Sequence, residues 1–226
     1  MPESTLFGQL IIYIVVLLLA VSAHEAAHAW MSYKFGDDTA LLLGRVTLNP
    51  VAHTDPIGTL LIPIISFIGS GAGVFVPLIG WGKPTPINPL RWRNKDMANV
   101  MVSIAGILAN LTIATIAFVI LKVVLKTGVA DDGGSLASVG EPVKLLLWMG
   151  LNLNLSLAIF NLLPIPPLDG SKVLYMVLPD SAQGTLDTLE RTPMLSTIVL
   201  IGLIYTGVTG AIISPVQHFV LRLLLA

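Results

Sequence analysis

Two histidines four residues apart enclose a glutamate in the sequence HEAAH at 24–28. On an α-helix, residues at positions i and i+4 lie on one face, so the imidazoles of His24 and His28 can bind one zinc ion. The carboxylate of Glu25, beside the first ligand, can take a proton from zinc-bound water and pass it to a leaving amine. The spacing therefore predicts a zinc-dependent hydrolytic site. The alternative is a pair of histidines without a metal on an ordinary helix.

A catalytic zinc site needs a third protein ligand and an open position for water. No third histidine follows within about two helical turns of His28, and the chain has no cysteine. The best candidate is Asp169, in the sequence NLLPIPPLDG at 161–170. An Asp-Gly pair after prolines is also typical of a simple turn, so the placement of Asp169 relative to the membrane must decide.

The composition predicts an α-helical polytopic membrane protein. Hydrophobic residues make up 54% of the chain and charged residues 11%, against roughly 25% charged in soluble domains. Crossing a bilayer takes about 20 apolar residues, and about four segments meet that need: 7–31, 97–125, 143–163 and 194–213. Residues 216–225 form a short amphipathic tail that we expect at the membrane interface. No basic tract stands out, so we expect no nucleic-acid partner.

The first apolar segment has the length of a signal peptide, but we expect it to be retained. Glu3 precedes it and no Lys or Arg does, so the positive region of a signal peptide is missing.

A fifth apolar segment, 57–81, is interrupted by the glycine-rich sequence GSGAG at 69–73. Eight of the twelve basic residues fall in the loops 32–56, 82–96 and 170–193, which the positive-inside rule places in the cytoplasm. That placement requires 57–81 to enter and leave the membrane on one side, so we expect a re-entrant segment there. A full crossing is the alternative.

The re-entrant topology also decides the role of Asp169. With it, the first and fourth segments both descend towards the cytoplasm, and His24, His28 and Asp169 reach the same side of the bilayer. A full crossing by 57–81 would put Asp169 on the opposite side. We further expect short β-strands near the cytoplasmic side, around 41–48, and an extended segment at 82–89, where three of eight residues are proline.

Together these motifs resemble the site-2 protease family of intramembrane zinc metalloproteases, in its compact prokaryotic form without an appended soluble domain. The resemblance covers about residues 8–178, and one departure is Ile107, where the family has proline. Beyond the two metal motifs it rests on three sequences: GRVTLNP at 44–50, HTDP at 53–56 and GKPTPINP at 82–89. It implies a single metalloprotease domain over 1–226, with the C-terminal helix and tail at about 194–226.

The resemblance implies a role for each motif residue. His24, His28 and Asp169 would bind one Zn²⁺ per chain, and Glu25 would be the catalytic acid and base. Asn161 would bind substrate or stabilise the oxyanion. The implied activity is hydrolysis of peptide bonds in or near transmembrane segments of other membrane proteins, as in regulated intramembrane proteolysis.

The implied location is the inner or plasma membrane of a prokaryotic cell, with the active site open to the cytoplasm. The partners are then the lipid bilayer and a transmembrane protein substrate. The sequence leaves the oligomeric state open, as it does the substrate.

Two polar residues have weaker assignments. His53, in a loop beside Asp55, either contacts substrate or organises its loop. Asn154 shares a helix face with Asn161, two turns away, and either contacts substrate or bonds neighbouring helices. Two other functions also remain open: a metal-ion or small-solute transporter, which would be expected to show paired broken helices in two repeats, and a non-catalytic zinc-binding scaffold, which would tolerate loss of Glu25.

Overall fold

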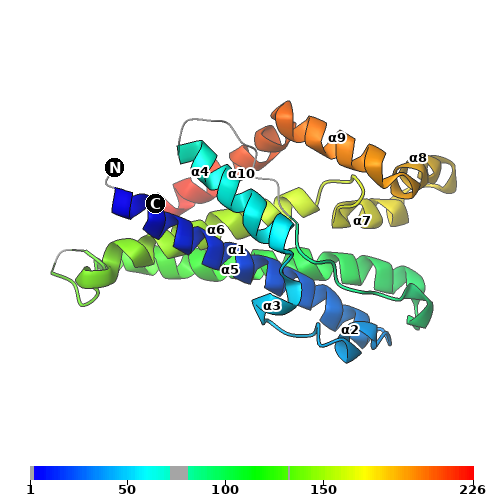
Figure 1. Ribbon diagram of the computed structural model, residues 1–226, viewed down its shortest axis with the longest axis horizontal. Coiled ribbons are helices and arrows are strands. Elements are labelled where there is room, and N and C mark those ends of the chain that lie inside the picture. The colour runs from blue at the N-terminus through cyan, green and yellow to red at the C-terminus, as the bar shows by residue number, and fades with distance from the viewer. Residues whose placement is uncertain (1–2, 72–80, 132) are drawn as a thin grey trace.

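The computed structural model describes residues 3–71, 81–131 and 133–226, and Figure 1 shows their arrangement. All regular structure in these residues is helical. The elements are α1 (Glu3–Lys34), α2 (Thr39–Leu42), α3 (Pro50–His53), the π-helix η1 (Pro56–Leu61), α4 (Ile62–Gly71), the 3₁₀ helix η2 (Pro89–Arg91), α5 (Lys95–Thr127), the 3₁₀ helix η3 (Ala137–Val139), α6 (Gly140–Asn161), α7 (Asp169–Val177), α8 (Asp180–Arg191), α9 (Pro193–Tyr205) and α10 (Val208–Leu225).

Four helices in the described part of the chain are long and apolar enough to cross a membrane: Leu6–Lys34, Lys95–Thr127, Ala137–Asn161 and Val208–Leu225. This confirms the predicted class of fold. The two ends of α5 show how its length is fixed. The side chain of Asn94 accepts a hydrogen bond from the N–H of Met97 at the start, and Gly128 adopts a left-handed conformation at the end.

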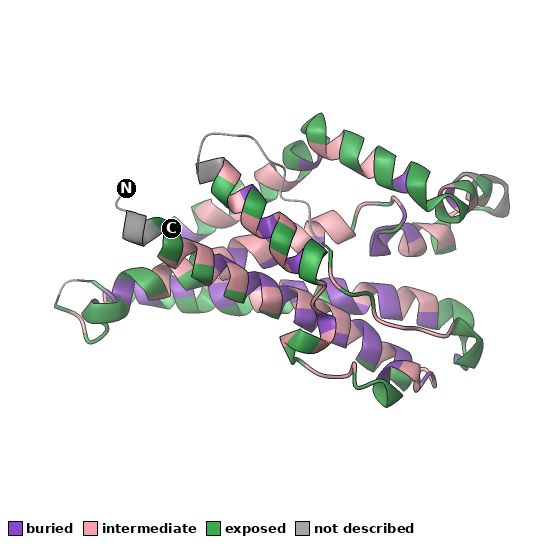
Figure 2. Ribbon diagram, in the orientation of Figure 1, coloured by how far each residue is buried: buried purple, intermediate pink, exposed green. Residues whose placement is uncertain are grey.

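The centre of the fold is formed by α1, α5 and α6, each of which packs against the other two. Small side chains lie at these contacts: Ala20, Ala98 and Ala158 are fully buried. Small residues let helix backbones approach closely, which favours van der Waals packing inside a membrane. Figure 2 shows the buried residues on the facing sides of these helices and exposed residues on the outer sides.

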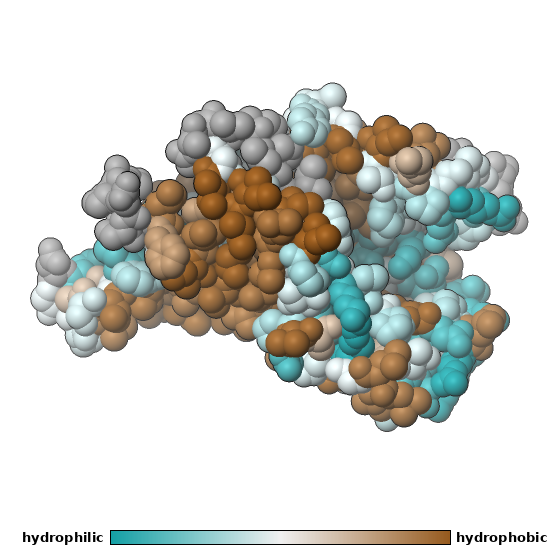
Figure 3. All heavy atoms as spheres, in the orientation of Figure 1, coloured by the Kyte–Doolittle hydropathy of each residue, from teal (hydrophilic) through white to brown (hydrophobic). Residues whose placement is uncertain are grey.

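The surface divides the molecule into an apolar part and a polar end. Figure 3 shows a broad apolar surface over α1 and α4, where Phe67 stacks on Tyr13 with ring centroids 5.4 Å apart. The hydrophilic residues gather at the end that contains α2, α7, α8 and the segment 82–93. This apolar surface is what a lipid bilayer would cover.

The predicted strands near 41–48 are wrong. Residues 39–42 form α2, and the following N–H groups bond locally, as when the N–H of Leu43 donates to the carbonyl of Thr39. The N–H groups of residues 42–45 are therefore used within the turn and do not bond to a neighbouring strand. The proline-rich segment, defined here as residues 82–89, is extended up to Asn88 as expected, but it pairs with no strand among the described residues.

The predicted span at 194–213 is also corrected. The helix ends at Tyr205, and Gly207 shortly after it adopts a φ of +78°, which few residues other than glycine can adopt. The shorter α9 precedes this break, and the helix of membrane-spanning length is α10, which begins at Val208 and includes the predicted amphipathic tail.

The segment 57–81 begins as a helix through η1 and α4, and residues 72–80 lie outside the described residues. Its two ends meet: the N–H of Trp81 donates to the carbonyl of Gly58, and Oγ1 of Thr59 donates to the carbonyl of Trp81. Trp81 therefore lies next to Gly58 and Thr59 at the start of the segment.

Candidate metal centre and active site

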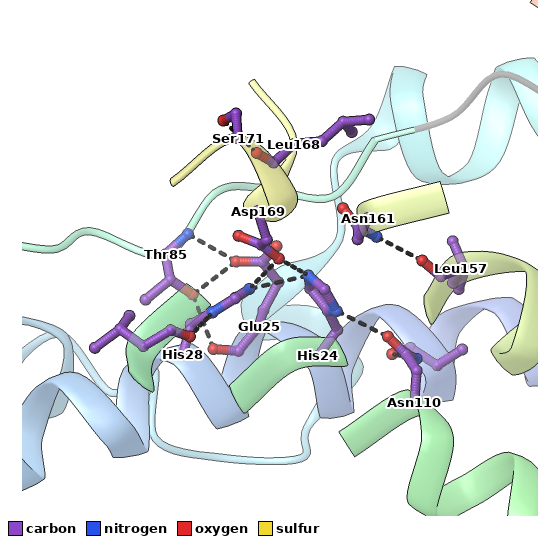
Figure 4. A network of polar contacts seen from close by, with 12 residues as sticks. His24, Glu25, His28, Thr85, Asn110, Leu157, Asn161, Leu168, Asp169 and Ser171 are labelled. Atoms are coloured by element: carbon purple, nitrogen blue, oxygen red, sulfur yellow. Dashed lines mark hydrogen bonds and ion pairs between the residues drawn. The ribbon is translucent and has the colours of Figure 1, made fainter. Parts of the chain in front are cut away.

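Three side chains from two distant parts of the chain converge at one point between α1 and α7 (Figure 4). Oδ2 of Asp169 lies 3.2 Å from Nε2 of His24 and 3.2 Å from Nε2 of His28. The two Nε2 atoms are 2.9 Å apart. The structure thus brings together the three residues that the sequence analysis selected as metal ligands, and the group has the composition and spacing to hold one ion.

The position of Asp169 depends on a close turn between α6 and α7. Asp169 is the first residue of α7, and Gly170 follows it against the end of α6. A Cβ at Gly170 would lie 2.2 Å from the carbonyl oxygen of Leu162, so only glycine fits. The Asp-Gly pair is therefore a turn signal and also the means of bringing the carboxylate to α1.

The outer nitrogens of the two imidazoles both face hydrogen-bond acceptors. Nδ1 of His28 lies 2.6 Å from the carbonyl oxygen of Val102. Nδ1 of His24 lies 2.8 Å from Oδ1 of Asn110. The amide nitrogen of Asn110 donates to the carbonyl of Ala20 and to Oδ1 of Asn154, so its oxygen is the atom that faces His24. Both histidines must therefore be protonated at Nδ1.

Protonation at Nδ1 leaves the Nε2 lone pair of each imidazole directed at the centre, where the Asp169 oxygen also points. Oδ2 of Asp169 is buried and accepts no hydrogen bond from the described residues. Three converging electron-pair donors need a cation between them, and two imidazole nitrogens with a carboxylate oxygen are a donor set that zinc prefers.

Gly106 of α5 makes room for both imidazoles. A Cβ at this position would lie 2.5 Å from Nε2 of His28 and 2.6 Å from Cε1 of His24. The sequence analysis assigned no role to Gly106, because a glycine inside an apolar helix does not reveal which side chains approach it. Ile107, the departure from the family pattern, is buried within an uninterrupted α5.

The carboxylate of Glu25 is held by Thr85 of the proline-rich segment. The N–H of Thr85 donates to Oε2 of Glu25 at 2.9 Å, and Oγ1 of Thr85 lies 2.7 Å from the same oxygen. The sequence analysis missed Thr85. The available signal was a single hydroxyl residue between two prolines, in a segment too rigid to be an ordinary loop.

The other three candidates have different surroundings. Asn161 ends α6 and donates from Nδ2 to the carbonyl of Leu157, and its second amide hydrogen has no partner among the described residues. His53 is fully buried, with Nε2 2.9 Å from the carbonyl oxygen of Thr47, and its own carbonyl accepts from Lys83. Asn154 is buried and bonds to Asn110 and Gly150. Substrate contact by His53 and Asn154 stays a prediction.

Comparison with known proteins adds to this geometry. Residues 122–204 match Peptidase family M50, a stretch that contains Asp169 and not the two histidines. The chain is 36% identical to YwhC of Bacillus subtilis over 187 residues, which cover 83% of this chain and 78% of that protein. It is 26% identical to Rip2 of Mycobacterium tuberculosis over 198 residues, which cover 85% of this chain and 67% of that protein. Rip2 of Mycolicibacterium smegmatis is 27% identical over 198 residues, which cover 86% of this chain and 68% of that protein.

All three relatives are named as candidate zinc metalloproteases. No solved structure matches the chain. The chain belongs to peptidase family M50, the site-2 protease family of zinc metalloproteases. Its function is intramembrane zinc-dependent proteolysis.

Proposed function

We propose that this chain is a zinc metalloendopeptidase of the HExxH type that hydrolyses peptide bonds in or near transmembrane segments of membrane-protein substrates. The observation that carries the proposal is the meeting of two imidazole nitrogens and one carboxylate oxygen within 3.2 Å, beside Glu25. His24, His28 and Asp169 would hold one zinc ion per chain. A zinc ion held by these residues would activate water for attack and would polarise the substrate carbonyl.

The residues around the ligands would then carry out the proton transfers. Glu25 follows the first ligand on α1, and the bonds from Thr85 fix its carboxylate in one orientation. It would accept a proton during attack on the peptide and donate it to the leaving amine. Asn161, through its free amide hydrogen, would bind the substrate or stabilise the oxyanion. Asn154 bonds to Asn110, which contacts His24, and substrate contact by His53 and Asn154 stays a prediction.

The proposed topology places the active site at the cytoplasmic side of a prokaryotic inner or plasma membrane. The basic loops support this orientation. The bonds from Trp81 to Gly58 and from Thr59 to Trp81 support a re-entrant segment at 57–81, because a full crossing would separate these ends by the thickness of the bilayer. Residues 1–226 would form one domain, with a catalytic core at about 8–178.

The proposal is tested by purifying the full chain, reconstituting it in lipid vesicles and measuring zinc content together with cleavage of a synthetic transmembrane peptide. We expect one zinc per chain, loss of cleavage when a chelator removes the metal, and recovery when zinc is returned. Asp169→Ala should lower the zinc content and abolish cleavage. Cleavage that continues at full rate without metal would overturn the proposal.

A further inference from the structure

A cavity of about 450 Å³ opens beside the candidate metal centre, at the polar end of the molecule. Its walls come from the proline-rich segment, the first turns of α5, and the helices α7 and α8. Thr85, which holds Glu25, lines this cavity, as does Ser171, two residues after Asp169. Figure 3 shows a hydrophilic hollow at this end of the molecule, between α8 and the proline-rich segment. The cavity therefore borders the site through Thr85 and Ser171, and its other lining residues have no role in the proposed chemistry.

Two carboxylates of α8 line the cavity, and neither has an ion-pair partner among the described residues. Asp187 and Glu190 are three residues apart, which puts them on one helix face. Lys172 of α7 lines the same cavity, and none of the three forms an ion pair with another described residue. Two carboxylates and one ammonium group give these walls a net negative charge. Unpaired charges that face one cavity favour a ligand of the opposite sign.

A buried hydroxyl provides an independent sign of a ligand. Ser103 of α5 is 1% exposed and lines the cavity, and its Oγ has no hydrogen-bond partner among the described residues. Buried hydroxyl groups are nearly always hydrogen-bonded, so a water molecule or a ligand is expected to pair with this one. A polypeptide backbone passing through the cavity would supply a carbonyl to accept from Ser103.

The location of the cavity indicates which part of a polypeptide would enter it. Lys172 and Tyr175 follow Asp169 on α7 by three and six residues, which at about 1.5 Å per residue places them roughly 4.5 and 9 Å further along the helix. An extended peptide advances about 3.3 Å per residue. The cavity would therefore take the substrate residues about one to three positions beyond the scissile bond, on the side away from the bilayer.

We infer that this cavity is a substrate subsite that binds a basic residue in the membrane-flanking segment of the protein to be cleaved. The inference rests on the proposed function. Membrane proteins carry an excess of Lys and Arg on their cytoplasmic flanks, the side on which the cavity is proposed to open. Asp187 and Glu190 bind the cationic side chain, and Ser103 donates to the backbone of the same segment. Substrates with a basic flank are selected by this contact.

The test uses the full chain in lipid vesicles and three peptides that share one transmembrane sequence. The peptides differ only in the two residues that flank this transmembrane sequence, which are Lys-Lys, Gln-Gln or Glu-Glu. Wild type should cleave the Lys-Lys peptide with a kcat/KM about tenfold above that of the Gln-Gln peptide. The double variant Asp187→Asn with Glu190→Gln should reduce this preference to about twofold or less. The charge-reversed variant Asp187→Lys with Glu190→Lys should prefer the Glu-Glu peptide.

A matched control neutralises two carboxylates at the other end of the molecule. Asp131 and Glu141 pair with Lys144, far along the chain from the cavity walls, and Asp131→Asn with Glu141→Gln should keep the wild-type preference. Equal kcat/KM values of wild type for the three peptides would overturn the inference. An unchanged ranking in both α8 variants would also overturn it.

Binding separates the failure of this inference from the failure of the proposed function. The Kd of each fluorescent peptide is measured on the Glu25→Gln chain, which needs no hydrolysis. A lower Kd for the Lys-Lys peptide that is lost with the α8 substitutions supports the subsite, even if wild type cleaves none of the peptides. Absence of cleavage by wild type contradicts the proposed protease function. Equal Kd values alongside normal cleavage contradict the subsite alone. Ser103→Ala should weaken binding of all three peptides while the protein remains at least as stable as wild type, because the lost hydroxyl has no hydrogen-bond partner among the described residues.

Discussion

Oδ1 of Asn110 lies 2.8 Å from Nδ1 of His24, and the amide nitrogen of Asn110 is bonded to Asn154 and to the backbone of α1. The amide cannot rotate without losing these bonds. It therefore fixes both the protonation of His24 and the orientation of its ring. This contact links the packing of α1, α5 and α6 to the geometry of the candidate metal centre.

Asn110→Ala should lower zinc affinity by roughly 10–100-fold, which is typical for loss of a group that orients a metal ligand. Competition with a chelator of known affinity measures the change on the purified chain. Asn152→Ala is the matched control, because among the described residues the side chain of Asn152 bonds only to the carbonyl of Trp148 in its own helix. Equal zinc affinities of the two variants would show that Asn110 only packs the helices together.

Gly106→Ala should reduce zinc binding more severely than any other single methyl group added to α5. The new Cβ would lie 2.5 Å from Nε2 of His28 and displace one or both imidazoles. Zinc content after purification measures the effect. Gly150→Ala adds the same methyl group to α6, where the nearest atom is 3.8 Å away, and should keep the metal. If Gly106→Ala binds zinc normally, the close approach of α5 is not required.

Thr85→Val should decrease cleavage about tenfold while zinc content stays unchanged. The substitution removes the hydroxyl bonded to Oε2 of Glu25 and keeps the shape of the side chain, so the carboxylate is held by the backbone N–H alone. Steady-state cleavage of a transmembrane peptide, normalised to zinc, measures the loss. Thr115→Val removes a hydroxyl that bonds within α5 and should be silent. Loss of zinc from Thr85→Val would indicate a structural role instead.

Asp37 should make stability depend on pH in the acidic range. It lies beyond the end of α1 and is fully buried. Burial raises the pKa of Asp37, but hydrogen bonds from Asn88, Thr39 and Ser32 outweigh this and lower it. Its stabilising contribution is therefore complete above the unfolded pKa of about 4 and is lost as the pH falls through the lower folded value.

Asp37→Asn should accordingly lower the thermal unfolding temperature at pH 7, by an amount that corresponds to about 1–3 kcal/mol, and the difference should shrink below about pH 4. Thermal unfolding in detergent across this pH range measures it. Asp38→Asn is the control, since the side chain of Asp38 is only half-buried and pairs with Arg91 at the surface. A difference between wild type and Asp37→Asn that stays constant from pH 7 to pH 3 would refute the assigned pKa direction.

The sequence predicted the parts of this protein that depend on local pattern and composition. Long apolar runs identified the first three spanning helices, and His24 and His28 were readable because a helix repeats its face every three to four residues. Asp169 needed a topological argument, since nothing in its own surroundings separates a ligand from a turn. The structure brings it to the two histidines, as that argument required.

The parts that sequence reasoning missed depend on contacts between distant segments. Thr85 reaches Glu25 from 60 positions away, and no local pattern reveals that contact. Gly106 has a role only because two imidazoles from α1 approach it. The break at Gly207 was missed because apolar residues continue on both sides of it, and one left-handed glycine decides where α9 ends.

The most direct test of the account compares wild type with Glu25→Gln for zinc content and for cleavage of a transmembrane peptide in vesicles. The substitution keeps the size of the side chain and removes its ability to accept a proton, while His24, His28 and Asp169 are untouched. The account predicts the same zinc content in both proteins and a loss of cleavage in the variant of at least a thousandfold, about what proton transfer by a side chain contributes. Equal zinc content with equal cleavage would contradict it.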